Sequence, residues 1–181
     1  MYKLFLLSII LLSILSCKKE EDKTDENKVL YDKIGGAYLM VNASSDIPID
    51  ANQDGRKSTN MIEEIQNLNN SYVYLTISTN GKFMSLQWPE QRVKDNIPRA
   101  NWDMPVLSFR LDFNDENNEI LIKNSDYYGK ENTWYPPEQA FVQGNAVNLK
   151  MRRHIVTPTG EQEVIINASY EKDPKFLEPY H

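Results

Sequence analysis

Short runs of alternating apolar and polar residues, separated by turn residues, recur from Val29 onward. In the clearest run, 105–113, Leu or Phe occupies every second position from Leu107 to Phe113. A period of two places one side of a strand in a core and the other side in water, so the pattern predicts an all-β domain. Further runs of this kind lie at 37–43, 72–78, 82–88, 119–123, 140–143, 147–156 and 163–171.

The connections between these runs are short and rich in Asn, Gly and Pro, which favour tight turns. They include 80–81, 117–118, 144–145 and 158–160. Strands joined in this way form an antiparallel meander, and a meander of about eight strands removes its exposed edges by closing into a barrel. We therefore expect one domain over 29–181 that folds as an antiparallel barrel, with a two-sheet sandwich as the alternative.

One short helix is expected after the first strand. Asn60 is a good N-cap residue, and Glu63 follows at the position where a capping box has its acid. The apolar residues at 61, 62, 65 and 68 would form one face over about two turns, and the helix would end near 69–70.

The N-terminus has the features of a signal peptide. Lys3 precedes an apolar run over 4–15, which is shorter than the roughly 20 residues that a membrane-spanning helix needs. The residues 14–17, Ile-Leu-Ser-Cys, resemble the lipobox of bacterial lipoproteins, in which the Cys is linked to diacylglycerol. The resemblance implies a signal peptide over 1–16 and a lipid anchor on Cys17, the only Cys of the chain. An ordinary secretory signal with an incidental Cys is the alternative.

The segment 18–28 contains no apolar residue and cannot bury surface, so together with the lipidated Cys it predicts a solvated, disordered tether over 17–28. Its Lys residues followed by acidic residues resemble the export signal of surface lipoproteins in Bacteroidota-type bacteria. That resemblance implies a position on the outer membrane that faces the cell exterior, with the periplasmic face as the alternative.

Four segments resemble the small lipocalin-like lipoproteins of Bacteroidota, and together they span most of the chain after the tether. This resemblance implies a lipocalin-like barrel that binds a ligand. The chain departs from the family at Gly36-Ala37-Tyr38, where a Gly-x-Trp pattern is usual. The matching segments are 35–41, 50–55, 80–83 and 168–172.

The most specific internal motif is Asp-Ala-Asn-Gln-Asp-Gly at 50–55. Oxygen side chains at loop positions 1, 3 and 5, followed by Gly, are the pattern of a Ca²⁺ loop. Position 12 is Met61, whose sulfur does not bind Ca²⁺, so Glu63 or Glu64 would have to replace it. Such a calcium ion would be structural, and a metal-free Asx-turn loop is the alternative. The candidate ligands are Asp50, Asn52, Asp54, Arg56 through its carbonyl, Ser58 through water, and Glu63.

An aromatic cluster next to Pro136 and Pro137 predicts a stacking platform for a sugar or an apolar ligand. Such rings also close barrel ends, which is the alternative interpretation. The candidate residues are Tyr127, Tyr128, Trp134 and Tyr135.

The net charge and the absence of catalytic motifs disfavour two classes of function. A net charge of -6 and a pI of about 5.0 disfavour nucleic acid as a partner. We interpret Lys150 and the basic run 152–154 as a solvated strand face. The chain has no HExxH, Gly-rich phosphate loop or G-x-S-x-G motif, so nothing positive indicates an enzyme.

We therefore expect a cell-envelope lipoprotein, bound to the membrane through its lipid, with a non-catalytic barrel for a small molecule or glycan. The alternatives are a structural or adhesion protein that contacts another envelope protein, and a hydrolase of polysaccharide or peptide.

Overall fold

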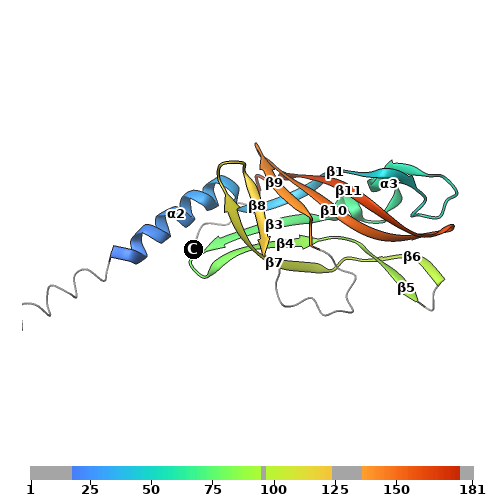
Figure 1. Cartoon of the computed structure of the whole chain (residues 1–181), viewed down its shortest axis with the longest axis horizontal. Coiled ribbons are helices and arrows are strands. Elements are labelled where there is room, and N and C mark those ends of the chain that lie inside the picture. Colours follow the sequence, from blue (N-terminus) through green and yellow to red (C-terminus); the bar gives the residue numbers. More distant parts are fainter. Residues whose placement is uncertain (1–17, 95–96, 124–135, 176–181) are drawn as a thin grey trace, which may run out of the picture.

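The computed structural model describes residues 18–94, 97–123 and 136–175 of the 181-residue chain. Within these residues most of the chain is β-structure, and one long helix precedes the strands (Figure 1). The all-β class that the alternation predicts is confirmed.

Eight antiparallel strands form a closed barrel, because the last strand, β11, pairs with the first, β1. The barrel that the meander pattern predicts is confirmed, and the two-sheet sandwich is excluded. Every predicted run coincides with one of these strands. In their order around the barrel they are β1 (Gly36–Ile49), β3 (Tyr72–Ser78), β4 (Gly81–Gln87), β7 (Val106–Asn114), β8 (Glu119–Lys123), β9 (Gln139–Gln143), β10 (Ala146–Thr157) and β11 (Gly160–Lys172).

The hairpin between β3 and β4 is as tight as predicted, but its turn is one residue earlier than the Asn-Gly pair suggests. Ser78 pairs with Gly81, so Thr79 and Asn80 form the loop. Gly81 has a φ of 143°, a conformation that only Gly adopts easily, and it therefore begins β4 rather than ending the turn.

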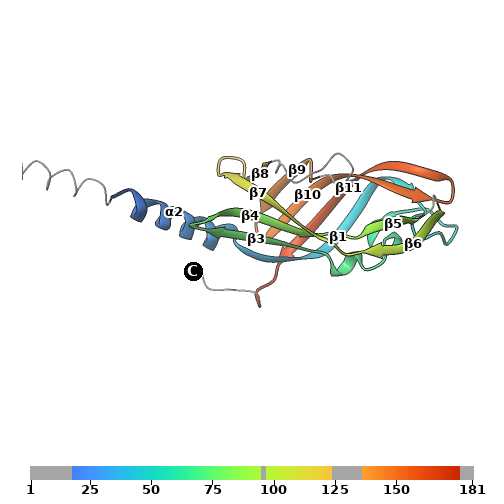
Figure 2. The same cartoon turned by 90° about the horizontal axis from the view of Figure 1, so that it is seen from below.

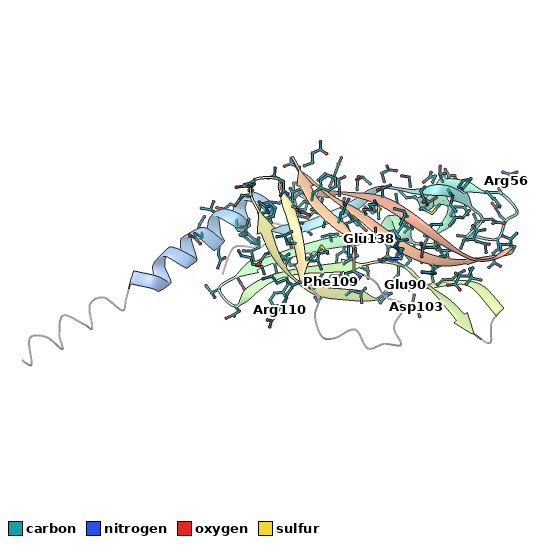
Figure 3. All side chains as sticks on the ribbon, in the orientation of Figure 1. Arg56, Glu90, Asp103, Phe109, Arg110 and Glu138 are labelled. Atoms are coloured by element: carbon teal, nitrogen blue, oxygen red, sulfur yellow. The ribbon has the colours of Figure 1, made fainter. Side chains whose placement is uncertain are left out.

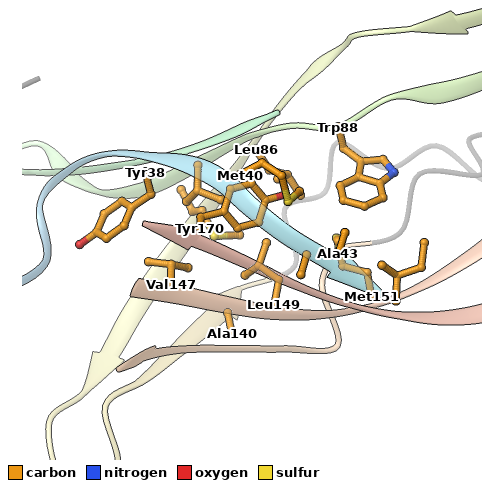
Figure 4. Packing of buried hydrophobic residues seen from close by; sticks show 14 of the residues in the cluster. Tyr38, Met40, Ala43, Leu86, Trp88, Ala140, Val147, Leu149, Met151 and Tyr170 are labelled. Carbon is orange, nitrogen blue, oxygen red and sulfur yellow. The ribbon is translucent and has the colours of Figure 1, made fainter. Parts of the chain in front are cut away.

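The barrel interior is filled by side chains. Tyr38, Trp88, Phe109 and Tyr170 are each less than 2% exposed and belong to one hydrophobic cluster with Leu and Met side chains of other strands. Figure 4 shows Tyr170 next to Met40 within this cluster. Each such side chain contributes about 1.5 to 3 kcal/mol through removal from water. The interior is thus the hydrophobic core of the protein.

The segment after Cys17 is a helix, α2 (Lys18–Ile34), where the sequence predicts a disordered tether. Leu30 and Ile34, one turn apart, are buried against the barrel, and the Tyr38 hydroxyl donates a 2.8 Å hydrogen bond to the Ile34 carbonyl. Packing of this apolar end stabilises the helix, which extends away from the barrel (Figure 2). The Lys28–Asp32 ion pair, at a spacing of four residues, adds a small contribution.

The predicted N-cap is confirmed, but the helix that it starts is short. The Asn60 side chain accepts a hydrogen bond from the Ile62 N–H, and α3 (Met61–Glu64) is one turn long. Ile65 is extended and Asn67 has a φ of 63°, so the chain leaves the helix and continues as the 3₁₀ turn Leu68–Asn70. Before α3, the short strand β2 (Ser58–Asn60) pairs with β1.

Two strands that the sequence does not predict form a separate ribbon, β5 (Glu90–Lys94) and β6 (Ile97–Asp103). Their sequences are polar, and β6 contains Pro98, which breaks the strand pattern. The Gln91 side chain fastens the ribbon to β10, because it donates to the Val156 carbonyl and accepts from the Val156 N–H.

Candidate functional site

The loop after β1 is held by hydrogen bonds from its own backbone. Asp50 Oδ2 accepts from the Gly55 N–H at 3.1 Å, Asn52 Oδ1 from the Asp54 N–H at 3.0 Å, and Asp54 Oδ1 from the Arg56 N–H at 2.8 Å. These are the local turns that Asn and Asp side chains favour. The structure therefore gathers Asp50, Asn52 and Asp54 in one loop, as the motif predicts.

The acidic residue that faces this loop is Glu64 and not Glu63. Glu64 is only 2% exposed, and its Oε2 accepts hydrogen bonds from the N–H groups of Ala51 at 2.8 Å and Asn52 at 3.4 Å. Glu63 is exposed and accepts from the Asn60 side chain at 2.8 Å. The Glu63 carboxylate thus interacts with the cap of α3.

The remaining candidate ligands, Arg56 and Ser58, follow the loop in the sequence and are exposed or partly exposed. Arg56 is exposed at the end of the molecule opposite α2 (Figure 3), and the Ser58 hydroxyl accepts from the Asn60 N–H at 3.0 Å. Within the described residues, no group of three or more His, Cys, Asp or Glu side chains is arranged to hold a metal. The calcium site thus stays a prediction, and it would need oxygen ligands of other kinds.

Burial raises the pKa of Glu64, because a buried carboxylate loses the water that stabilises its charge. The hydrogen bonds from Ala51 and Asn52 oppose this rise, and the nearby charges of Asp50 and Asp54 add to it. Three acidic side chains, Asp50, Asp54 and Glu64, therefore lie close together where the loop meets the core.

The barrel interior contains a buried cation. Arg152 and Arg153 are neighbours on β10, but Arg152 faces outward to Glu138 and Glu163 whereas Arg153 is 4% exposed inside the barrel. The interpretation of the run 152–154 as a solvated face is therefore wrong for Arg153. The alternation along β10 gives the reason, since every second side chain from Val147 to Thr157 is buried.

Arg153 lies between an indole ring and a carboxylate. Its guanidinium carbon is 5.6 Å from the centre of the Trp88 ring, and its Nε is 3.9 Å from Glu90 Oε1. Burial raises the pKa of Glu90 from 4.5 to about 7, and the charge of Arg153 limits the rise. The pair joins β10 to the first residue of the β5–β6 ribbon, and the ionisation of Glu90 falls near neutral pH.

The outer wall of the barrel carries an apolar groove of about 490 Å³. Cross-strand pairs arrange its lining, because Ala37 lies opposite Tyr74 and Leu39 lies opposite Tyr72. Leu39 is 47% exposed and Val106 is 50% exposed, so both present apolar surface to the groove. The lining residues are Ala37, Leu39, Tyr72, Tyr74, Ser85 and Val106.

A second hollow, of about 560 Å³, lies between α2 and the barrel and has charges of both signs. Lys33 bridges it, because its ammonium group is 2.8 Å from Asp115 and 5.0 Å from the centre of the Phe113 ring. Two acids, Glu26 and Asp115, line the hollow, and Asp115 is paired with Lys33. The hydrolase alternative stays a prediction.

Several candidate residues lie outside the described residues. These are Cys17 and the four aromatic residues Tyr127, Tyr128, Trp134 and Tyr135, so the lipid anchor and the stacking platform stay predictions. In the described part of the chain, the helices are too short or too polar to cross a membrane.

Sequence reasoning missed Glu90 and assigned Arg153 to the wrong side of its strand. The period of β10 contains the signal for Arg153, since its position continues the series of buried residues from Val147. Glu90 carries no such signal, because its partial burial comes from contact with a distant strand. Comparison of the chain with protein-family models, with curated proteins and with solved structures finds no match.

Proposed function

We propose that the protein is a cell-envelope lipoprotein whose barrel is a non-catalytic binding module, anchored through Cys17 and facing the cell exterior. Its ligand is a small apolar molecule that binds to the outer wall of the barrel. The observation that carries this proposal is the groove lined by Leu39, Tyr72 and Val106.

The filled interior is the reason to assign the ligand to the wall. Trp88, Phe109 and Tyr170 occupy the space that a ligand would take in an open barrel. The groove has a volume in the range of small-molecule sites, about 300 to 1,000 Å³. Its two Tyr rings provide flat apolar surfaces, and the Ser85 hydroxyl provides a polar group for orientation.

Binding of anilinonaphthalene sulfonate, an anionic dye with large apolar rings, tests the groove. We expect the dye to fluoresce on the folded protein and Leu39→Ser to weaken its binding at least several-fold. Leu121→Ser is the matched control, because Leu121 is 42% exposed on β8 and does not line the groove. Equal binding to both variants would contradict the assignment.

The anchor is tested separately, by metabolic labelling with a palmitate analogue. We expect label on the full chain and none on Cys17→Ser, and protease added to intact cells should cleave the labelled protein. Label on both chains would refute the lipid anchor, whereas protection from protease would refute only the outward orientation.

A role in contact with another envelope protein is the second candidate. Val41 and Ile47, 47% and 43% exposed, extend the apolar surface of β1 beyond the groove. Crosslinking in intact cells should then capture a partner that Val41→Ser together with Ile47→Ser releases. Loss of dye binding with unchanged crosslinking would separate the two functions.

A further inference from the structure

The loop 50–55 has a carboxylate partner that the motif alone does not identify. Met61, at position 12 of the loop, is fully buried in the core and cannot serve as a ligand. Glu64, one helical turn later, approaches the loop instead and accepts hydrogen bonds from Ala51 and Asn52. The last acid of the loop is therefore displaced along the chain rather than missing.

Asp50 is buried in a way that leaves one of its oxygens without a partner. The residue is 7% exposed, and the hydrogen bond from Gly55 to Oδ2 directs its carboxylate into the loop. Oδ1 is buried and has no hydrogen-bond partner in the described residues. A buried carboxylate oxygen without a partner is costly, because it has lost its water and gained nothing in exchange.

Among the described residues, no basic side chain pairs with the Asp50 carboxylate. Within the described residues, no ion pair joins a Lys, Arg or His side chain to Asp50, Asp54 or Glu64. Arg56 and Lys57, the nearest basic residues in the sequence, are exposed. Two buried carboxylates therefore face one loop without a positive charge between them.

We propose that this loop binds one Ca²⁺, with Asp50 Oδ1 and the Glu64 carboxylate as its charged ligands. The Asn52 amide oxygen, loop carbonyls and water complete the shell. Within the described residues, no three acidic, His or Cys side chains are arranged around one point, so amide, carbonyl and water oxygens supply the rest of the shell. Ca²⁺ accepts six to eight oxygens from amides, carbonyls and water as well as from carboxylates.

The first test is the thermal unfolding of the full chain in CaCl₂, MgCl₂ or EDTA at constant ionic strength. At a Ca²⁺ concentration a hundred times its Kd, we expect Tm to rise by about 5 to 10 °C, because the ion binds only the folded state. Isothermal titration should give one Ca²⁺ per chain. Equal melting in Ca²⁺ and EDTA, with no binding heat, would overturn the proposal.

Asp50→Asn tests the ligand assignment, because the amide oxygen still accepts the Gly55 N–H while the charge is lost. We expect this variant to lose the Ca²⁺-dependent rise in Tm. Asp46→Asn is the matched control, since Asp46 is exposed and its Oδ1 also accepts a backbone N–H, that of Ile165 at 2.9 Å. It should keep the full rise.

Wild-type Ca²⁺ affinity in Asp50→Asn would overturn the proposal. If circular dichroism shows that Asp50→Asn does not fold, Asn52→Ala decides, because Asn52 lies at the loop surface and outside the core. We expect at least tenfold weaker binding in Asn52→Ala, and unchanged binding there would equally overturn the assignment.

Discussion

Two carboxylates beside the core, the buried Glu64 and the partly buried Glu90, are stabilised in different ways. Glu64 accepts backbone N–H groups and has no cationic side chain beside it among the described residues. Glu90 has the guanidinium of Arg153 at 3.9 Å, but its Oε1 has no hydrogen bond among the described residues. Backbone N–H donors orient the Glu64 carboxylate but leave its negative charge uncompensated, so a cation from solution can bind to it. The Glu90 carboxylate is instead compensated by Arg153, a cation of the protein itself.

The largest expected effect is at Arg153. Arg153→Met leaves the partly buried Glu90 without its cation, which we expect to lower the free energy of unfolding by about 3 kcal/mol at pH 8. The loss should shrink at pH 5.5, where Glu90 is protonated because its pKa is about 7. Urea unfolding at the two pH values measures both effects.

Arg152→Met is the control, since Arg152 is on the solvent side of the same strand and exposed ion pairs contribute little. A loss in Arg153→Met that is equal at both pH values would show that packing against Trp88, and not charge, is what Arg153 provides.

The second effect is a pH dependence that comes from Glu90. Its pKa is 4.5 in the unfolded chain and about 7 in the fold, so the native state binds more protons between these values. Stability should therefore fall as pH rises from 4.5 to 7, by about 3 kcal/mol at most, and stay level above. Glu90→Gln should flatten this slope in denaturation curves collected across that range.

Glu138→Gln serves as the control for Glu90, because Glu138 is an acid at the surface that pairs with Arg152. If Glu90→Gln keeps the slope of the native chain, another group titrates there, and the contrast between the two carboxylates is lost.

The smallest effect is at the helix that carries Glu64. Asn60→Ala removes the N-cap of α3, and we expect a loss of about 1 kcal/mol in the free energy of unfolding. Exposed Asn70→Ala should change it less. A loss as large as that at Arg153 would mean that local hydrogen bonds hold the loop as strongly as a buried ion pair holds the ribbon.

The strand pattern could be read from the sequence because alternation is a local property. Phe109 and Leu111 belong to one run and are buried on one face, as their spacing predicts. The β5–β6 ribbon could not be found in this way, because its stability comes from pairing and from the contact of Gln91 with Val156 on another strand. Helix α2 was missed since its stabilising contacts, at Leu30 and Ile34, are with the barrel.

In the candidate calcium loop, too, some features could be predicted from local sequence and others depend on tertiary contacts. The motif identified Asp50, Asn52 and Asp54, because turn formation and ligand type depend on residues next to each other in the chain. It could not distinguish Glu63 from Glu64, since that depends on which side of a one-turn helix faces the core.

The amino-acid sequence by itself determined the all-β class, the positions of the eight barrel strands and the cap of α3, because periodicity and turn chemistry act over a few residues. Tertiary structure alone decided that Arg153 meets Glu90 and Trp88, that Glu64 faces the loop, and that the barrel is filled. Burial and charge pairing depend on which strands come together in space, and no single segment carries that information.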